Sequence, residues 1–195
     1  MSIAQQTGGA DRILQVAIIL FAQKGYEATS TREIVEAAGV TKPMLYYYFG
    51  SKEGLCKAAI RRFVQPFFAE LRQTAAECRE PRELLVDFVW KNLQHFNDHR
   101  DVFRFYMSLC FGPDREKFLE DFESLGKEVR ALFWDLTSRI AQTGILRPGC
   151  EEDFAMTLQH MLHARNMACF FERTEPTREL AQRTVGNLLD GFGTG

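Results

Sequence analysis

The sequence predicts an all-α protein of about nine helices. Apolar residues recur at the three- and four-residue spacing of amphipathic helices along most of the 195-residue chain. The alternation of apolar and polar residues that marks a strand is nearly absent. Glycine and proline interrupt the helical stretches at a few separate points, which sets the expected helix ends.

The first predicted helix follows a short tail. Residues 1–9 are polar and contain glycine, which is typical of a loose chain end. Ile13, Ala17 and Phe21 then fall on one face of a helix, and Gly25 ends it.

Two short helices come next, joined by a tight turn at Gly39. Ser30 and Glu33 have the spacing of a capping box, which satisfies two backbone N–H groups at a helix start. The second short helix has Pro43 in its first turn, where a missing N–H costs nothing, and it stops at Gly50. Two short helices joined by a glycine turn are typical of a helix-turn-helix.

Longer helices fill the rest of the chain. The first of them follows Ser51 and contains Pro66, which removes one backbone hydrogen bond and bends the axis. Gly112-Pro113 and the loop around residues 144–149 separate later helices. These helices are expected to begin near residues 52, 81, 100, 114, 151 and 177.

Composition is that of an ordinary globular protein, with 46% hydrophobic and 26% charged residues. It excludes a disordered chain, a disulfide-stapled miniprotein and a collagen-like fibre. The net charge of −2 gives no hint of a nucleic-acid partner, but it is unevenly spread. Residues 1–62 carry eight Lys and Arg against five acids, or +3, and the remainder carries 16 against 21, or −5.

Cysteine usage favours a reducing compartment, because the five cysteines include no C-x-x-C pair. The N-terminus lacks the pattern of a signal peptide, and no apolar run approaches the length of a membrane span. We therefore expect a cytoplasmic protein.

Enzyme and metal signals are missing from the sequence. It has no G-x-S-x-G, G-x-G-x-x-G, P-loop or H-E-x-x-H motif. His95 and His99, like His160 and His163, have helical spacing without a carboxylate or cysteine in register. We expect no enzymatic activity, no metal and no cofactor.

Residues 12–56 resemble the N-terminal domain of the TetR (tetracycline-repressor-like) family of transcriptional regulators. The matching residues read R-I-L-x-x-A-x-x-L-F-A-x-x-G-Y-x-x-T-S-T-R-E-I-V-x-A-A-G-V-T-K-P-M-L-Y-Y-Y-F-x-S-K-E-x-L. The resemblance implies a helix-turn-helix DNA-binding domain at 10–52, after a flexible tail at 1–9. It also implies a helical effector-binding and dimerisation domain at 53–195.

The second short helix is the expected DNA-reading helix. Three consecutive tyrosines cannot all be buried on one helical face, so at least one points outward. A tyrosine hydroxyl can donate to a phosphate, and its ring can contact a sugar or a thymine methyl. Met44 suits a thymine methyl, and Lys42 suits guanine or a phosphate. The resemblance implies DNA contacts at Thr31, Arg32, Lys42, Pro43, Met44, Tyr46, Tyr47, Tyr48 and Lys52.

The resemblance also implies an apolar effector pocket and a two-fold dimer. Aromatic residues at helical spacing commonly fill a core, but some can line a pocket. The expected pocket residues are Phe67, Trp90, Phe103, Tyr106, Met107 and Trp134. The expected dimer residues, on the last two helices, are Met161, Leu162, Phe170, Val185, Leu188 and Leu189.

Together these features predict a homodimeric transcriptional regulator, a repressor released from a palindromic operator by a small apolar or amphipathic ligand. The alternative is a helical ligand-binding or protein-interaction module with a vestigial DNA-reading head. Loss of Thr31, Arg32 or Lys52 would indicate that alternative, and all three are present.

Overall fold

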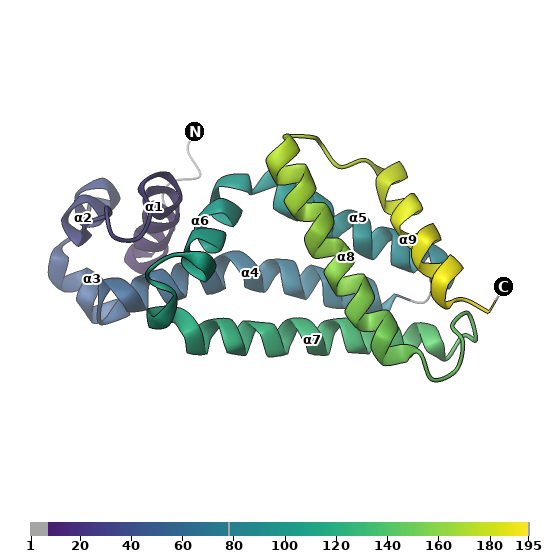
Figure 1. The fold of residues 1–195 in the computed structure, drawn as a ribbon. Helices are drawn as coiled ribbons and strands as arrows, with labels where there is room; N and C mark the ends of the chain where they lie inside the picture. The colour runs from purple at the N-terminus through teal and green to yellow at the C-terminus, as the bar shows by residue number, and fades with distance from the viewer. Residues whose placement is uncertain (1–7, 78, 195) are drawn as a thin grey trace, which may run out of the picture. The chain divides into compact units, whose positions relative to one another are not determined.

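The computed structural model describes residues 8–77 and 79–194, and this part of the chain forms nine α-helices and one 3₁₀ turn (Figure 1). It holds no strand beyond an isolated bridge between Leu146 and Gly193. The all-α prediction is confirmed. The elements are α1 Gly9–Lys24, α2 Thr31–Ala38, α3 Lys42–Phe49, α4 Lys52–Ala76, α5 Pro81–Asp98, α6 Arg100–Phe111, η2 Arg115–Phe118, α7 Leu119–Ala141, α8 Glu151–Glu172 and α9 Arg178–Phe192.

Two predicted boundaries differ from the structure. The helix expected from about residue 114 begins instead with the 3₁₀ turn η2, and α7 starts at Leu119. The tail expected at 1–9 falls mostly outside the described residues, and Gly9 already belongs to α1.

The described chain folds into two compact units. Residues 8–66 and 101–123, here called the head unit, include α1–α3, the first part of α4, most of α6, η2 and the start of α7. Residues 67–100 and 124–194, called the body unit, include α5, α8 and α9. The division within α4 therefore falls after Pro66 and not at the expected boundary between residues 52 and 53. Its first turns belong to the head because they bury Leu55 and Cys56 there.

The core of the head unit explains why its short helices fold. α1 packs on α2 and α3, and α2 packs on α3 (Figure 1). Ile13 and Phe21 of α1, Ile34 of α2 and Leu45 of α3 are fully buried. Leu45 is the one buried residue of α3, and Phe49 is half-buried one turn further along, so few side chains anchor this helix.

The body unit is organised around α5, which packs on α8 and α9. The Asp87 carboxylate of α5 accepts hydrogen bonds from the guanidinium groups of Arg79 and Arg178 and so fixes the start of α9. A buried amide pair joins α5 to α8, with Asn166 Nδ2 donating to Asn92 Oδ1 at 2.9 Å.

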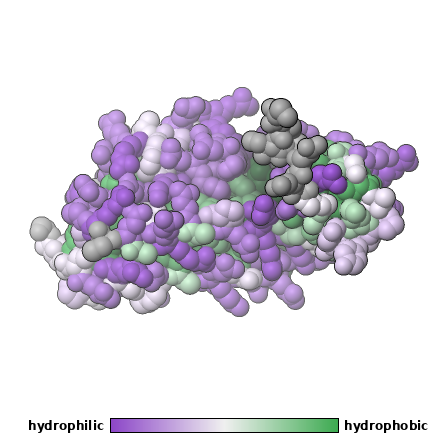
Figure 2. Space-filling model, turned by 180° about the vertical axis from the view of Figure 1, so that it is seen from behind, coloured by the Kyte–Doolittle hydropathy of each residue, from purple (hydrophilic) through white to green (hydrophobic). Residues whose placement is uncertain are grey.

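Surface chemistry agrees with the composition. Hydrophilic residues cover most of the face in Figure 2, and apolar residues show between them in patches. Within the described residues, no helix combines the length and apolar character needed to span a membrane.

The buried amide pair predicts non-additive stability effects. Asn92→Ala and Asn166→Ala should each lower the free energy of unfolding by about 1–3 kcal/mol, because each leaves a buried amide without its partner. The double variant should lose less than the sum of the two. Urea unfolding of the four proteins measures this, with Gln94→Ala on the exposed side of α5 as control. Additive losses would contradict the contact.

Candidate nucleic-acid interface

The start of α2 is fixed by the predicted capping box. Ser30 Oγ accepts from the backbone N–H of Glu33 at 3.1 Å, and Ser30 N–H donates to Glu33 Oε2 at 2.9 Å. Lys24 Nζ, at the end of α1, donates to Glu33 Oε1 at 2.6 Å. The hydrogen bond from Lys24, followed by those from Ser30, lowers the pKa of Glu33 to about 2. One carboxylate therefore ties the end of α1 to the start of α2.

Two expected phosphate-contacting residues lie at this helix start. Thr31 is the first residue of α2 and is half-buried, and Arg32 follows it in an exposed position. Arg32 Nε donates to Glu36 Oε1 at 2.7 Å, one turn further along. A guanidinium has five N–H groups, so this bond leaves donors for a phosphate.

Helix α3 presents its polar and aromatic residues outward. Tyr47 is 83% exposed, and Tyr46 and Tyr48 are exposed beside it. The rings of Tyr47 and Tyr48 meet edge to face, with centroids 5.1 Å apart. Lys42 Nζ lies 5.9 Å from the centroid of the Tyr46 ring. The prediction of outward tyrosines is confirmed, and α3 offers a continuous aromatic surface.

Met44 is less free than its neighbours. Its Sδ lies beside Gly9 at the start of α1, where an added Cβ would come within 2.8 Å. Pro43, in the first turn of α3, is exposed next to it. The start of α1 therefore limits the positions that Met44 can take against a DNA base.

Lys52, the first residue of α4, is held from two sides. Its ammonium donates to the backbone carbonyl of Glu27 at 3.2 Å and lies 4.4 Å from the centroid of the Tyr26 ring. Tyr26 and Glu27 belong to the turn between α1 and α2, and sequence reasoning did not single them out. A lone aromatic residue in an otherwise polar turn was the available signal.

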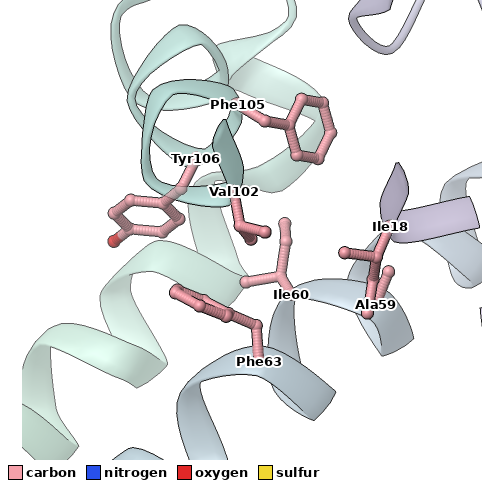
Figure 3. A pocket seen from close by; sticks show the side chains of 7 residues that line it. All are labelled: Ile18, Ala59, Ile60, Phe63, Val102, Phe105 and Tyr106. Atoms are coloured by element: carbon pink, nitrogen blue, oxygen red, sulfur yellow. The ribbon is translucent and has the colours of Figure 1, made fainter. Parts of the chain in front are cut away.

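The expected pocket residues do not all lie inside the protein. Tyr106 lines an apolar cavity of about 10 Å³ in the head unit, between α1, α4 and α6 (Figure 3). Ile60 and Val102 point toward each other there, and the Tyr106 hydroxyl points away. Its other lining residues are Ile18, Ala59, Phe63 and Phe105. As it stands, the cavity is about the size of one water molecule.

The other five candidates have different surroundings. Phe103 is buried and Met107 half-buried in the head unit, whereas Phe67 of the body unit stacks on the His95 ring at 4.2 Å. Trp90 is half-buried, and Trp134 is exposed. The expectation that Trp134 lines an interior pocket is therefore corrected: its helix turns it to the surface.

The expected dimer residues separate into two groups. Leu162, Val185, Leu188 and Leu189 are buried in the body unit and so offer little surface to a partner. Met161 and Phe170 are half-buried. The exposed apolar residues of α8 are Met156 and Phe171, which sequence reasoning missed because α8 has apolar residues on more than one face.

The described residues form no candidate metal site. The described residues contain no cluster of three or more His, Cys, Asp and Glu side chains that could hold a metal ion. Burial, followed by the neighbouring His99, lowers the pKa of His95 to about 4, which favours its neutral form.

A capped α2, a glycine turn and an α3 with an exposed aromatic face together define a helix-turn-helix DNA-binding protein. Residues 13–59 match the family model for bacterial regulatory proteins of the tetR family. The HTH-type transcriptional repressor KstR2 of Rhodococcus jostii is 34% identical to the chain over 153 residues, which cover 77% of this chain and 74% of the relative. The chain therefore belongs to the TetR family of bacterial regulatory proteins.

Other comparisons agree. The HTH-type transcriptional repressor ComR of Escherichia coli is 47% identical over 79 residues, covering 40% of this chain and 38% of ComR. The solved TetR family regulator PfmR of Thermus thermophilus is 25% identical, with a TM-score of 0.69 over 97% of this chain and 100% of that one. The protein is a DNA-binding transcriptional regulator and not an enzyme.

The Glu33 contacts predict a pH-dependent contribution to stability. Because the pKa of Glu33 is lowered in the folded state, this contribution is present above its unfolded pKa of about 4.3 and is lost as pH falls toward 2. Thermal unfolding between pH 6 and pH 2.5 should show a steeper fall for wild type than for Glu33→Gln. Glu123→Gln, at an exposed site of the head unit, should follow wild type. Parallel curves for wild type and Glu33→Gln would contradict the role of this carboxylate.

Proposed function

We propose that the protein is a homodimeric cytoplasmic repressor whose head unit reads a palindromic operator and is released by a small apolar or amphipathic ligand. The exposure of Tyr47, on an α3 whose Leu45 is buried in the head core, carries this proposal. An exposed aromatic side chain has no role in the fold of the head, whereas base edges and sugars offer it a binding partner.

The residues of α3 limit what it can read. Its sequence KPMLYYYF contains no Asn, Gln, Asp, Glu or Arg. Bidentate contacts to adenine and carboxylate contacts to cytosine are therefore beyond this helix. Lys42 can bind guanine, and Met44 and the tyrosines can contact thymine methyl groups. We expect half-sites in which thymines lie beneath α3.

Phosphate contacts would set the register on DNA. The free N–H groups and positive dipole at the start of α2 favour a phosphate next to Thr31, and Arg32 adds a charge there. Lys52 supplies a second cation at the start of α4. These contacts carry little sequence information, but they make affinity depend on salt.

A second copy of the chain is the proposed partner of α8. Met156, His160, His163, Met167 and Phe171 lie at spacings of three and four residues, which places them on one helical face. Phe171 is 75% exposed and Met156 is exposed at the other end of this face. A two-fold pairing of such faces would give a dimer that carries two α3 helices, and half-sites in successive major grooves lie about 34 Å apart on DNA.

Support for a ligand comes from the head cavity. The helices that line it also hold the head together, so an apolar molecule that widens it would alter the position of α1 or α6. Small-molecule pockets measure about 300–1,000 Å³, so a ligand would have to separate these helices. A ligand that binds such a conformer more tightly weakens operator binding by the same factor.

Tyr47→Ala should weaken operator binding about tenfold or more, which corresponds to ~1.4 kcal/mol, because it removes the most exposed reading side chain. Fluorescence anisotropy at several salt concentrations, with DNA from upstream of the protein's own gene, measures the Kd. Phe111→Ala is the matched control, since Phe111 is a 79% exposed aromatic residue outside α3. Wild-type binding at the non-specific level of about 10⁻⁴–10⁻⁶ M on both upstream and random DNA would overturn the proposal.

Phe171→Asp should convert the dimer to a monomer, because a carboxylate buried within the α8 interface is costly to desolvate. Size-exclusion chromatography with light scattering at micromolar concentration measures this change. Operator affinity should fall as well, because the two heads no longer bind as one linked pair. Phe111→Asp should stay dimeric. An unchanged mass for Phe171→Asp would show that α8 does not form the interface.

A further inference from the structure

The ring of Tyr26 lies close to two ammonium groups. Lys52 Nζ is 4.4 Å from its centroid and Lys117 Nζ is 5.3 Å away. Phe118 meets the ring edge to face at 5.2 Å, and Phe21 of α1 lies 5.9 Å away. Tyr26 is therefore buried by two aromatic rings and two cations from widely separated parts of the chain.

Lys117 is itself held firmly. Its ammonium lies 2.7 Å from both Asp114 Oδ1 and Glu27 Oε1. Hydrogen bonds to Asp114 and then Glu27 raise the pKa of Lys117, so the ammonium stays charged. Glu27 thus binds Lys117 with its side chain and Lys52 with its backbone carbonyl. This single residue links η2 to the start of α4.

The rest of segment 101–123 reinforces the same attachment. Arg104 Nη2 donates to the carbonyl of Ala22 at 3.3 Å, near the end of α1. Asp121, at the start of α7, pairs with Lys57 at 3.1 Å and Arg61 at 3.3 Å on α4. The segment therefore contacts the end of α1, the α1–α2 turn and the first turns of α4, all within the head unit.

We propose that Lys117 and Tyr26 are positioning residues for DNA binding: through the ring of Tyr26 and the carbonyl of Glu27, η2 holds the Lys52 ammonium where it meets an operator phosphate. The inference rests on the proposed phosphate contact of Lys52 and adds that η2 determines the position of the Lys52 ammonium. A cation held in advance loses less freedom on binding and therefore binds more tightly. Displacement of η2 frees Lys52 and weakens operator binding, although η2 itself need not touch DNA.

Lys117→Met tests the inference, with Lys127→Met, at an exposed lysine of α7, as the matched control. Lys117→Met should weaken operator binding about three- to tenfold and lower the slope of log K against log salt by about one per subunit, as the loss of one phosphate contact does. Lys127→Met should change neither quantity. Tyr26→Phe should bind as wild type because the ring face is kept, and Tyr26→Leu should behave like Lys117→Met.

A double-variant cycle separates positioning from general loss of structure. In a Lys52→Ala background, Lys117→Met should cause no further loss of affinity, because the group that it positions is already absent. The thermal midpoint of each variant, measured in parallel, accounts for unfolding. The inference would be overturned if the affinity losses of Lys52→Ala and Lys117→Met multiplied in the double variant, or if Lys117→Met left the salt slope unchanged. Either result would leave the proposed operator binding standing. Wild type without a specific operator would instead overturn the proposed function, and this inference with it.

Discussion

The anchoring of α3 by Leu45 is the constraint on which the rest of the head depends. An eight-residue helix is not stable alone in water, so it forms only where α1 and α2 pack against it and bury Leu45. Because only Leu45 of α3 is buried, the other faces of this helix are open to solvent, and aromatic residues occupy them. The same core positions the capped start of α2, so base-reading and phosphate-binding groups share one rigid support.

The head is not made by the N-terminal residues alone. Segment 101–123 adds Phe118, which is fully buried, and Phe105, whose ring stacks on Phe21 at 5.4 Å. This arrangement explains how a ligand-responsive repressor could transmit a change to its DNA-binding surface. Segment 101–123 lies within the head and contacts the α1–α2 turn, so in the proposed function a movement of α6 or η2 would act on the head through these contacts.

Local signals in the sequence predicted the helices, the capping box and the outward tyrosines, because each depends on residues within a few positions of one another. Long-range contacts could not be predicted in this way. Lys117 and Glu27 are 90 positions apart, and nothing in either segment indicates the other. Likewise, α8 and α9 are apolar on more than one face, so their spacing could not show that Val185 and Leu188 face the core while Phe171 faces outward.

Base reading by α3 can be measured directly with operator duplexes that contain thymine or deoxyuridine beneath this helix. Deoxyuridine lacks the 5-methyl group and keeps the hydrogen-bonding pattern of thymine. Wild type should lose about fourfold in affinity for each contacted methyl removed, since burying one such group contributes ~0.8 kcal/mol. Tyr47→Ala should be much less sensitive to the exchange. Equal binding of both duplexes by wild type would contradict an operator read through the aromatic face of α3.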